Sequence, residues 1–173
     1  MDKLIDKKRE TVIFCSHKSV FTIGEGEKKS FFLNEIRSDR GGSITYHDEG
    51  SLMIYFILKV SSPPLFYRKI LKIFKKFFLT VDKKIYYDKK RPGFYIENQK
   101  IASIGFRYKK GFSKHGVCIN LNPNLSKFNL INPCNLKGVK ATSFTKEGYE
   151  YEREKIISFL KKLIEDEFSK TKS

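Results

Sequence analysis

The stretch Gly93-Phe-Tyr-Ile-Glu-Asn-Gln-Lys-Ile-Ala-Ser-Ile-Gly-Phe-Arg-Tyr108 decides how this chain folds. Two runs of largely apolar residues flank a short polar connection at residues 97–99, and this pattern predicts a β-hairpin. The second run begins with Lys100 and includes Gly105, where a ligand or another backbone can come close. A lysine at the edge of a strand is usually solvated, so Lys100 by itself indicates only an exposed side chain.

The same criteria extend outward from this hairpin and predict an α+β fold. Apolar runs bounded by turn residues predict further strands, and apolar residues at helical spacing predict two long helices. We expect these elements to form one mixed, largely antiparallel sheet flanked by helices. With no repeat or linker in its 173 residues, the chain is expected to be a single domain, 1–173. The expected strands cover residues 11–16, 19–23, 43–46, 52–60, 93–97, 100–108 and 115–121, and the expected helices 65–79 and 147–168.

The first of these helices follows Ser61-Ser-Pro-Pro64, which is typical of a helix start because serine caps and proline fits the first turn. Its lysines lie opposite its apolar residues. That arrangement suits a basic docking or membrane-surface helix, but a surface helix packed on a sheet is the interpretation we favour. The apolar set is Phe66, Ile70, Ile73, Phe74, Phe77 and Phe78.

Composition narrows the class of protein further. A hydrophobic fraction of 40% is too high for a disordered chain. No apolar run is long enough to span a membrane, and the charged start lacks a signal core, so a cytoplasmic protein is expected. Three widely spaced cysteines form neither a disulfide framework nor a zinc pattern. The net charge of +16 predicts an acidic partner, and without a nucleic-acid-binding signature an acidic protein is at least as likely as nucleic acid.

Cys134 is the strongest candidate for chemistry. It follows Pro133 outside any apolar run, so it is not core filler. A free cysteine has a pKa near 8.5, and a neighbouring cation lowers that pKa and populates the nucleophilic thiolate. If Lys100 points at Cys134, it can stabilise the thiolate and, when neutral, take a proton from an attacking amine. An ordinary loop thiol is the alternative.

Two glycine-containing segments add weaker signals. Arg40-Gly41-Gly42 offers close backbone approach, and His115-Gly116 opens a strand. His47 stands beside two acidic residues, but two further ligands with metal spacing are missing, so no metal is expected.

Taken together, the segments Ser38-Asp-Arg-Gly-Gly-Ser-Ile-Thr-Tyr-His47, Lys100-Ile-Ala-Ser-Ile-Gly105, His115-Gly116 and Ile131-Asn-Pro-Cys134 resemble the lipoyl(octanoyl) transferase family. Val20-Phe-Thr-Ile-Gly24 resembles that family's early strand and turn. The similarity covers about residues 11–143. Each segment is weak by itself, but their order is specific.

The resemblance implies a biotin- and lipoate-ligase type of fold, with a mixed sheet flanked by helices. It also implies that Cys134 takes an octanoyl group from acyl carrier protein and passes it to a lysine on lipoyl domains of 2-oxoacid dehydrogenases or the glycine cleavage protein. Lys100 would lower the thiol pKa and act as acid and base. No cofactor, nucleic acid or membrane is implied, and a monomer is expected. The acyl chain would lie against Arg40, Gly41, Gly42, Ser43, Ile44, Thr45, Tyr46, His47, Ser103, Ile104, Gly105, Gly116, Val117 and Cys118.

The chain departs from the family pattern at three places. Asp48 and Glu49 replace the usual Gly-Pro, Asn135 replaces the usual glycine, and the segment before residue 11 is short. Two other functions therefore stay open. One is an ATP-dependent lipoate or biotin-type ligase, which needs no nucleophilic cysteine. The other is a non-catalytic module that binds acidic carrier or lipoyl domains.

Overall fold

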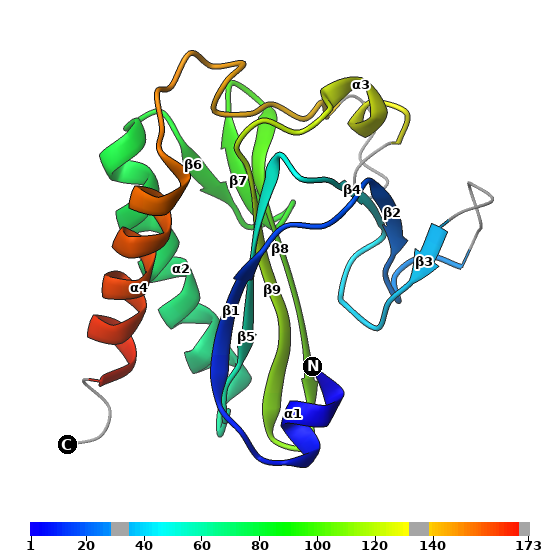
Figure 1. The fold of residues 1–173 in the computed structure, drawn as a ribbon, viewed down its shortest axis with the longest axis vertical. Coiled ribbons are helices and arrows are strands. Elements are labelled where there is room, and N and C mark those ends of the chain that lie inside the picture. Colours follow the sequence, from blue (N-terminus) through cyan, green and yellow to red (C-terminus); the bar gives the residue numbers. More distant parts are fainter. Residues whose placement is uncertain (29–34, 132–138, 170–173) are drawn as a thin grey trace.

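The structure, a computed structural model, describes residues 1–28, 35–131 and 139–169 and contains two sheets, with two long helices on one face of the larger sheet and the smaller sheet on its other side (Figure 1). All neighbours in the larger sheet are antiparallel. In the smaller sheet the central strand is parallel to one neighbour and antiparallel to the other. The larger sheet has the order β1 (Thr11–Cys15), β5 (Ser51–Ile57), β9 (Phe112–Asn120), β8 (Gln99–Lys109), β7 (Gly93–Ile96) and β6 (Tyr86–Asp88). The smaller has the order β3 (Glu35–Arg37), β2 (Val20–Ile23) and β4 (Ile44–His47).

The α+β class is confirmed, but the expectation of one sheet is wrong. β4 and β5 are joined by three residues and yet belong to different sheets. All four residues of β4 are buried, because one face contacts α3 (Leu125–Phe128) and the other faces the larger sheet. A strand buried on both faces needs a layer on each side, and here α3 and the larger sheet supply the two layers.

Helices α2 (Pro63–Val81) and α4 (Arg153–Ser169) cover the opposite face of the larger sheet (Figure 1). All six predicted apolar residues of α2 are buried, so the interpretation as a helix packed on a sheet is confirmed. The Phe78 and Phe94 rings lie 4.5 Å apart between their centroids, at the contact of α2 with β7. None of the described helices is long and apolar enough to cross a membrane.

The last helix begins at Arg153, six residues later than predicted. The residues before it pack onto the core without helical structure. Tyr149 and Tyr151 both lie with their ring centroids 5.8 Å from that of Phe144. The predicted apolar position Tyr151 therefore packs on the core from a segment that precedes the helix.

The hairpin of β7 and β8 is confirmed. Glu97 and Asn98 both have positive φ, 45° and 71°, which is the backbone of a two-residue type I′ turn. Short elements escaped prediction because three to five residues show no period: α1 (Asp2–Asp6), α3, β3 and β6.

Candidate functional site

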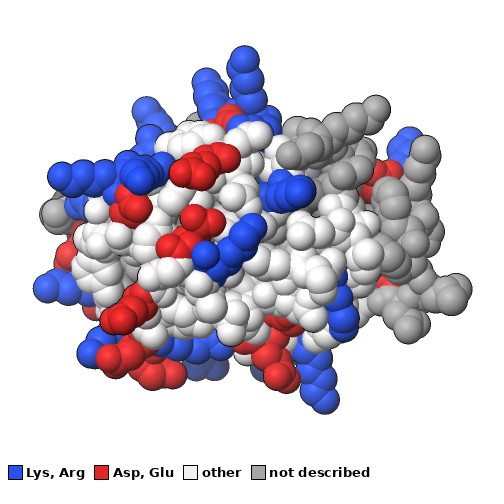
Figure 2. Space-filling model, turned by 90° about the horizontal axis from the view of Figure 1, so that it is seen from above, with Lys and Arg blue, Asp and Glu red and all other residues white. Residues whose placement is uncertain are grey.

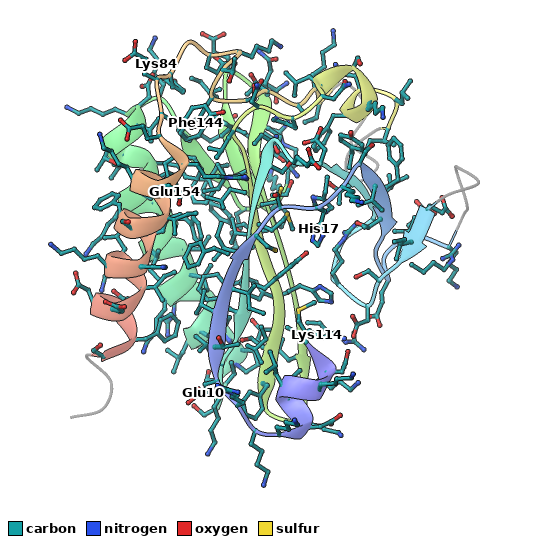
Figure 3. The ribbon with its side chains drawn as sticks, viewed as in Figure 1. Glu10, His17, Lys84, Lys114, Phe144 and Glu154 are labelled. Atoms are coloured by element: carbon teal, nitrogen blue, oxygen red, sulfur yellow. The ribbon has the colours of Figure 1, made fainter. Side chains whose placement is uncertain are left out.

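A cavity of about 250 Å³ lies between the two sheets. Figure 3 shows His17 in this space, between the larger sheet and β2. The walls come from distant parts of the sequence, because the smaller sheet lies across β5, β8 and β9. Eleven predicted residues line the cavity: Arg40, Gly41, Gly42, Thr45, His47, Lys100, Ser103, Ile104, Gly105, Gly116 and Cys118.

Four predicted substrate-binding residues do not line the cavity, and strand alternation explains three of them. Ile44 and Tyr46 point to the other face of β4, where they pack with Phe128. Val117 points into the core beneath α2 and α4. The Ser43 hydroxyl, just before β4, donates a hydrogen bond to Glu27 Oε2 at 3.2 Å.

Lys100 is buried, with 1% of its surface exposed, so the solvated interpretation of this residue is wrong. Its backbone is fixed on both sides: its N–H donates to the Lys140 carbonyl at 2.8 Å, and its carbonyl accepts from Thr142 N–H at 2.9 Å. The side chain passes close to Gly93, where a Cβ atom would stand 3.1 Å from Lys100 Cε. Its ammonium lies 5.3 Å from the Tyr95 ring centroid. Burial at the cavity wall gives this cation a defined position.

Cys134 lies outside the described residues. The two other cysteines are free thiols, and neither is activated. Burial raises the pKa of Cys118 to about 12, and burial also raises the pKa of Cys15. Both are therefore protonated at neutral pH, and neither is a nucleophile.

The Arg40 side chain holds the Gly41-Gly42 turn against β2. Its guanidinium donates to the carbonyls of Thr22 and Ser43, each at 2.7 Å, and to that of Gly41 at 3.0 Å. Gly24 packs against this turn so closely that a Cβ atom there would stand 2.3 Å from the Gly42 carbonyl oxygen. The arginine thus fixes one wall of the cavity.

Two histidines of the wall are neutral at physiological pH. Burial, then the charges of Arg40 and His17, lower the pKa of His47 to about 3. Its Nδ1 has no hydrogen-bond partner within the described part of the chain. Burial also lowers the pKa of His115, against the opposing effect of Asp39, whose Oδ1 lies 2.7 Å from His115 Nε2. Residues 1–28, 35–131 and 139–169 contain no cluster of three His, Cys, Asp or Glu that could hold a metal.

The two acidic residues that depart from the family pattern do not line the cavity. Asp48 Oδ1 accepts from Gly50 N–H at 3.0 Å, and its Oδ2 accepts from Asn124 N–H at 2.7 Å. The Glu49 carbonyl accepts a hydrogen bond from Arg153 at 3.3 Å. Asp48 therefore builds the turn between the sheets and ties it to the start of α3.

Several lining residues carried no local signal in the sequence. They belong to no motif and reach the cavity only through the tertiary structure. They are Met1, His17, Ile36, Met53, Tyr55 and Pro92. Val20, Thr22, Ser38 and His115 also line the cavity; they stand in segments that resemble the family but were not among the predicted site residues.

Gly116→Ala is expected to destabilise the protein by about 2–3 kcal/mol, because a new methyl group overpacks a rigid site. The Cβ atom would stand 2.0 Å from the Ile54 carbonyl oxygen, and backbone cannot move aside cheaply. The change is measured as a shift of the urea midpoint.

Gly111→Ala is the matched control for Gly116→Ala. Gly111 has φ +76°, and a methyl group added there would meet nothing within 4 Å, so only backbone strain of about 1 kcal/mol is expected. Equal losses in the two variants would contradict crowding at Gly116.

A family model described as the lipoyl protein ligase A/B catalytic domain matches residues 1–165. The octanoyltransferase of Buchnera aphidicola subsp. Acyrthosiphon pisum is 35% identical over 142 residues, which cover 77% of this chain and 67% of that protein. The octanoyltransferase of Francisella tularensis subsp. novicida is 37% identical over 142 residues, covering 76% and 68%.

Solved structures show the same fold at low sequence identity. A crystal structure of lipoate-protein ligase A bound with ATP has a TM-score of 0.76 at 14% identity, covering 97% of this chain and 78% of that one. A bipartite lipoate protein ligase of Thermoplasma acidophilum, solved in a study with its E2 lipoyl domain, has a TM-score of 0.76 at 12% identity, covering 97% and 76%. The predicted fold group is confirmed.

Proposed function

The chain belongs to the lipoyl protein ligase A/B catalytic domain family, and from this premise we propose that it transfers octanoyl groups to lipoyl domains through a thioester on Cys134. Its curated relatives are named octanoyltransferases, which makes the chain an acyltransferase, and the lipoyl ligase family model supports a role in protein lipoylation. The finer assignments, Cys134 as nucleophile and Lys100 as acid and base, are our proposal.

The observation that carries the proposal is the buried ammonium of Lys100 on the wall of an otherwise largely apolar cavity. Val20, Met53 and Ile104 give that wall surfaces against which a hydrocarbon chain packs. Each methylene group buried there contributes about 0.8 kcal/mol. A buried cation at the edge of such a cavity suits a reacting head group followed by an apolar tail.

The two half-reactions use one proton that Lys100 gives and takes back. The Cys134 thiolate attacks the donor thioester, its C–S bond forms while the donor C–S bond breaks, and Lys100 protonates the departing thiolate. The neutral amine of the target lysine then attacks the acyl-enzyme. A C–N bond forms, the Cys134 C–S bond breaks, and the surplus amine proton returns to Lys100. Ala141, seven positions after Cys134, forms a parallel bridge with Lys100, which supports this pairing of residues.

We propose acyl carrier protein as the donor and lipoyl domains as the acceptors. A net charge of +16 suits acidic protein partners. Figure 2 shows Lys and Arg side chains around the rim of the upper face, with Asp and Glu among them and uncharged surface between. The free thiols of Cys15 and Cys118 support a reducing compartment, the cytoplasm. We further propose that residues 1–173 act as one monomeric domain.

Incubation of the purified protein with octanoyl-carrier protein and no ATP is expected to add one octanoyl group, located on Cys134 by peptide mass spectrometry. A thioester donor is already activated, so the reaction needs no nucleotide. Adding an apo-lipoyl domain should then clear the adduct and octanoylate that domain.

The matched incubation contains free octanoate and ATP in place of the thioester. Octanoylation of the lipoyl domain only under that condition would identify an ATP-dependent ligase and refute the transferase. Binding of both partners without any adduct would identify a non-catalytic module.

A further inference from the structure

The N-terminal helix α1 closes one end of the cavity. Met1 is a lining residue, and its Sδ atom accepts a hydrogen bond from His115 N–H at 3.4 Å. His115 pairs with Phe106, six positions along β8 from Lys100, on the order of 20 Å at about 3.3 Å per residue. Figure 1 shows α1 beside the lower ends of β8 and β9. Met1 and Lys100 therefore lie at opposite ends of the cavity.

An ion pair between Asp2 and the buried side chain of Lys114 holds α1 in this place. Lys114, 6% exposed, has its Nζ 2.7 Å from Asp2 Oδ2 and 2.8 Å from Asp39 Oδ2. Lys109 adds a second pair to Asp2, at 2.9 Å from Oδ1. Hydrogen bonds from Lys114, then Lys109, hold the pKa of Asp2 well below its usual range, so this carboxylate is charged throughout the neutral range. Figure 3 shows Lys114 beside α1.

Apolar packing adds to this attachment. Ile5 is 2% exposed and forms a cluster with Ile57 and Phe112, against which Met1 and Leu4 also pack. The Met1 side chain is unbranched and adapts to an irregular gap, so it seals the end of the cavity without strain. An acyl chain that reaches this end must displace Met1 together with the anchored helix.

We propose that Met1, held by the Asp2–Lys114 pair, forms the floor of the acyl cavity and sets the longest acyl chain that the protein accepts. This inference rests on the proposed acyl transfer and assigns a length-limiting residue to it. Met1 is a specificity residue, and Asp2 and Lys114 position it.

Asp2→Arg tests the floor because it places a cation against Lys114 and Lys109 and releases α1. The probes are octanoyl- and dodecanoyl-pantetheine at equal concentration, which need no carrier docking, and the readout is the ratio of the two acyl adducts by intact mass. We expect the dodecanoyl-to-octanoyl ratio to rise about tenfold or more. A tenfold rise corresponds to a change of about 1.4 kcal/mol in the relative free energy of acylation by the two chains. Asp2→Asn, a milder release, should raise the ratio less.

Asp6→Arg is the matched control, since it makes the same charge change on the same helix. Asp6 pairs only with the exposed Lys110 among the described ion pairs, at 2.7 Å, and an exposed pair contributes little. Its ratio should equal that of the unmodified protein.

Each other outcome overturns the inference in a recognisable way. An unchanged ratio in both Asp2 variants, with octanoyl adduct still formed, would refute the length-limiting role of Met1 and leave the proposed acyl transfer unaffected. An equal rise in Asp6→Arg would assign the effect to charge alone. If no variant, and not the unmodified protein either, formed an adduct of either length, both the proposed acyl transfer and the length-limiting role of Met1 would be refuted.

Discussion

Cys134→Ala is expected to eliminate the octanoyl adduct and to reduce transfer by more than about 1,000-fold, the scale on which enzymes lose activity with their nucleophile. No other thiol replaces it, because the pKa values of Cys15 and Cys118 are raised and both stay protonated at neutral pH. Transfer is measured as octanoylation of an apo-lipoyl domain, and the adduct by intact mass.

The matched control is Cys15→Ala, which removes a half-buried thiol on β1. It should leave both adduct and transfer intact. Cys134→Ala should also keep the urea midpoint, so that loss of activity reports chemistry and not unfolding. Transfer retained by Cys134→Ala would refute the assignment of the nucleophile.

Lys100→Met is expected to slow alkylation of Cys134 about tenfold at pH 7 but by less than about twofold at pH 9. A cation within about 4–6 Å lowers a thiol pKa by about 1–3 units from its usual value near 8.5. Without the cation the thiolate is scarce at pH 7, whereas at pH 9 most of the thiol ionises either way. The measurement is the iodoacetamide rate across this pH range, with the labelled residue identified by mass.

Methionine is unbranched like lysine and only one atom shorter, so it fills most of the same buried space and removes the ammonium group. Lys90→Met is the matched control, because Lys90 is an exposed lysine in the turn before β7. Its rates should match the unmodified protein at both pH values. A rate profile for Lys100→Met that is parallel to the unmodified one would mean that Lys100 and Cys134 are not coupled.

Local patterns were sufficient for the elements with a clear period. The apolar positions of α2 and the hairpin of β7 and β8 follow from helical spacing and from a short polar connection. The burial of the Lys100 side chain could not be predicted from such local patterns. Its burial depends on the Thr142 backbone from a distant segment and on a register shift at Phe94 and Tyr95. Neither feature is encoded in the residues next to it.

The second sheet was missed for a related reason. The sequence of β4 predicts an ordinary strand. Its second face, turned away from the larger sheet, is covered through contacts such as that of Tyr46 with Phe128, which only the tertiary structure shows. The motif residues of the cavity were found through resemblance to a family. Met1 and His17 belong to no motif, and only the tertiary structure brings them to the cavity.

A single carboxylate, that of Asp39, couples two boundaries of the cavity. One oxygen holds the His115 ring and the other holds the ammonium that also anchors α1. A substitution of Asp39 or of either residue that it holds, His115 or Lys114, removes an interaction from the others. Substitutions at these positions are therefore expected to occur together among related proteins. The volume available to a fatty tail would then be inherited as a unit and not tuned one position at a time.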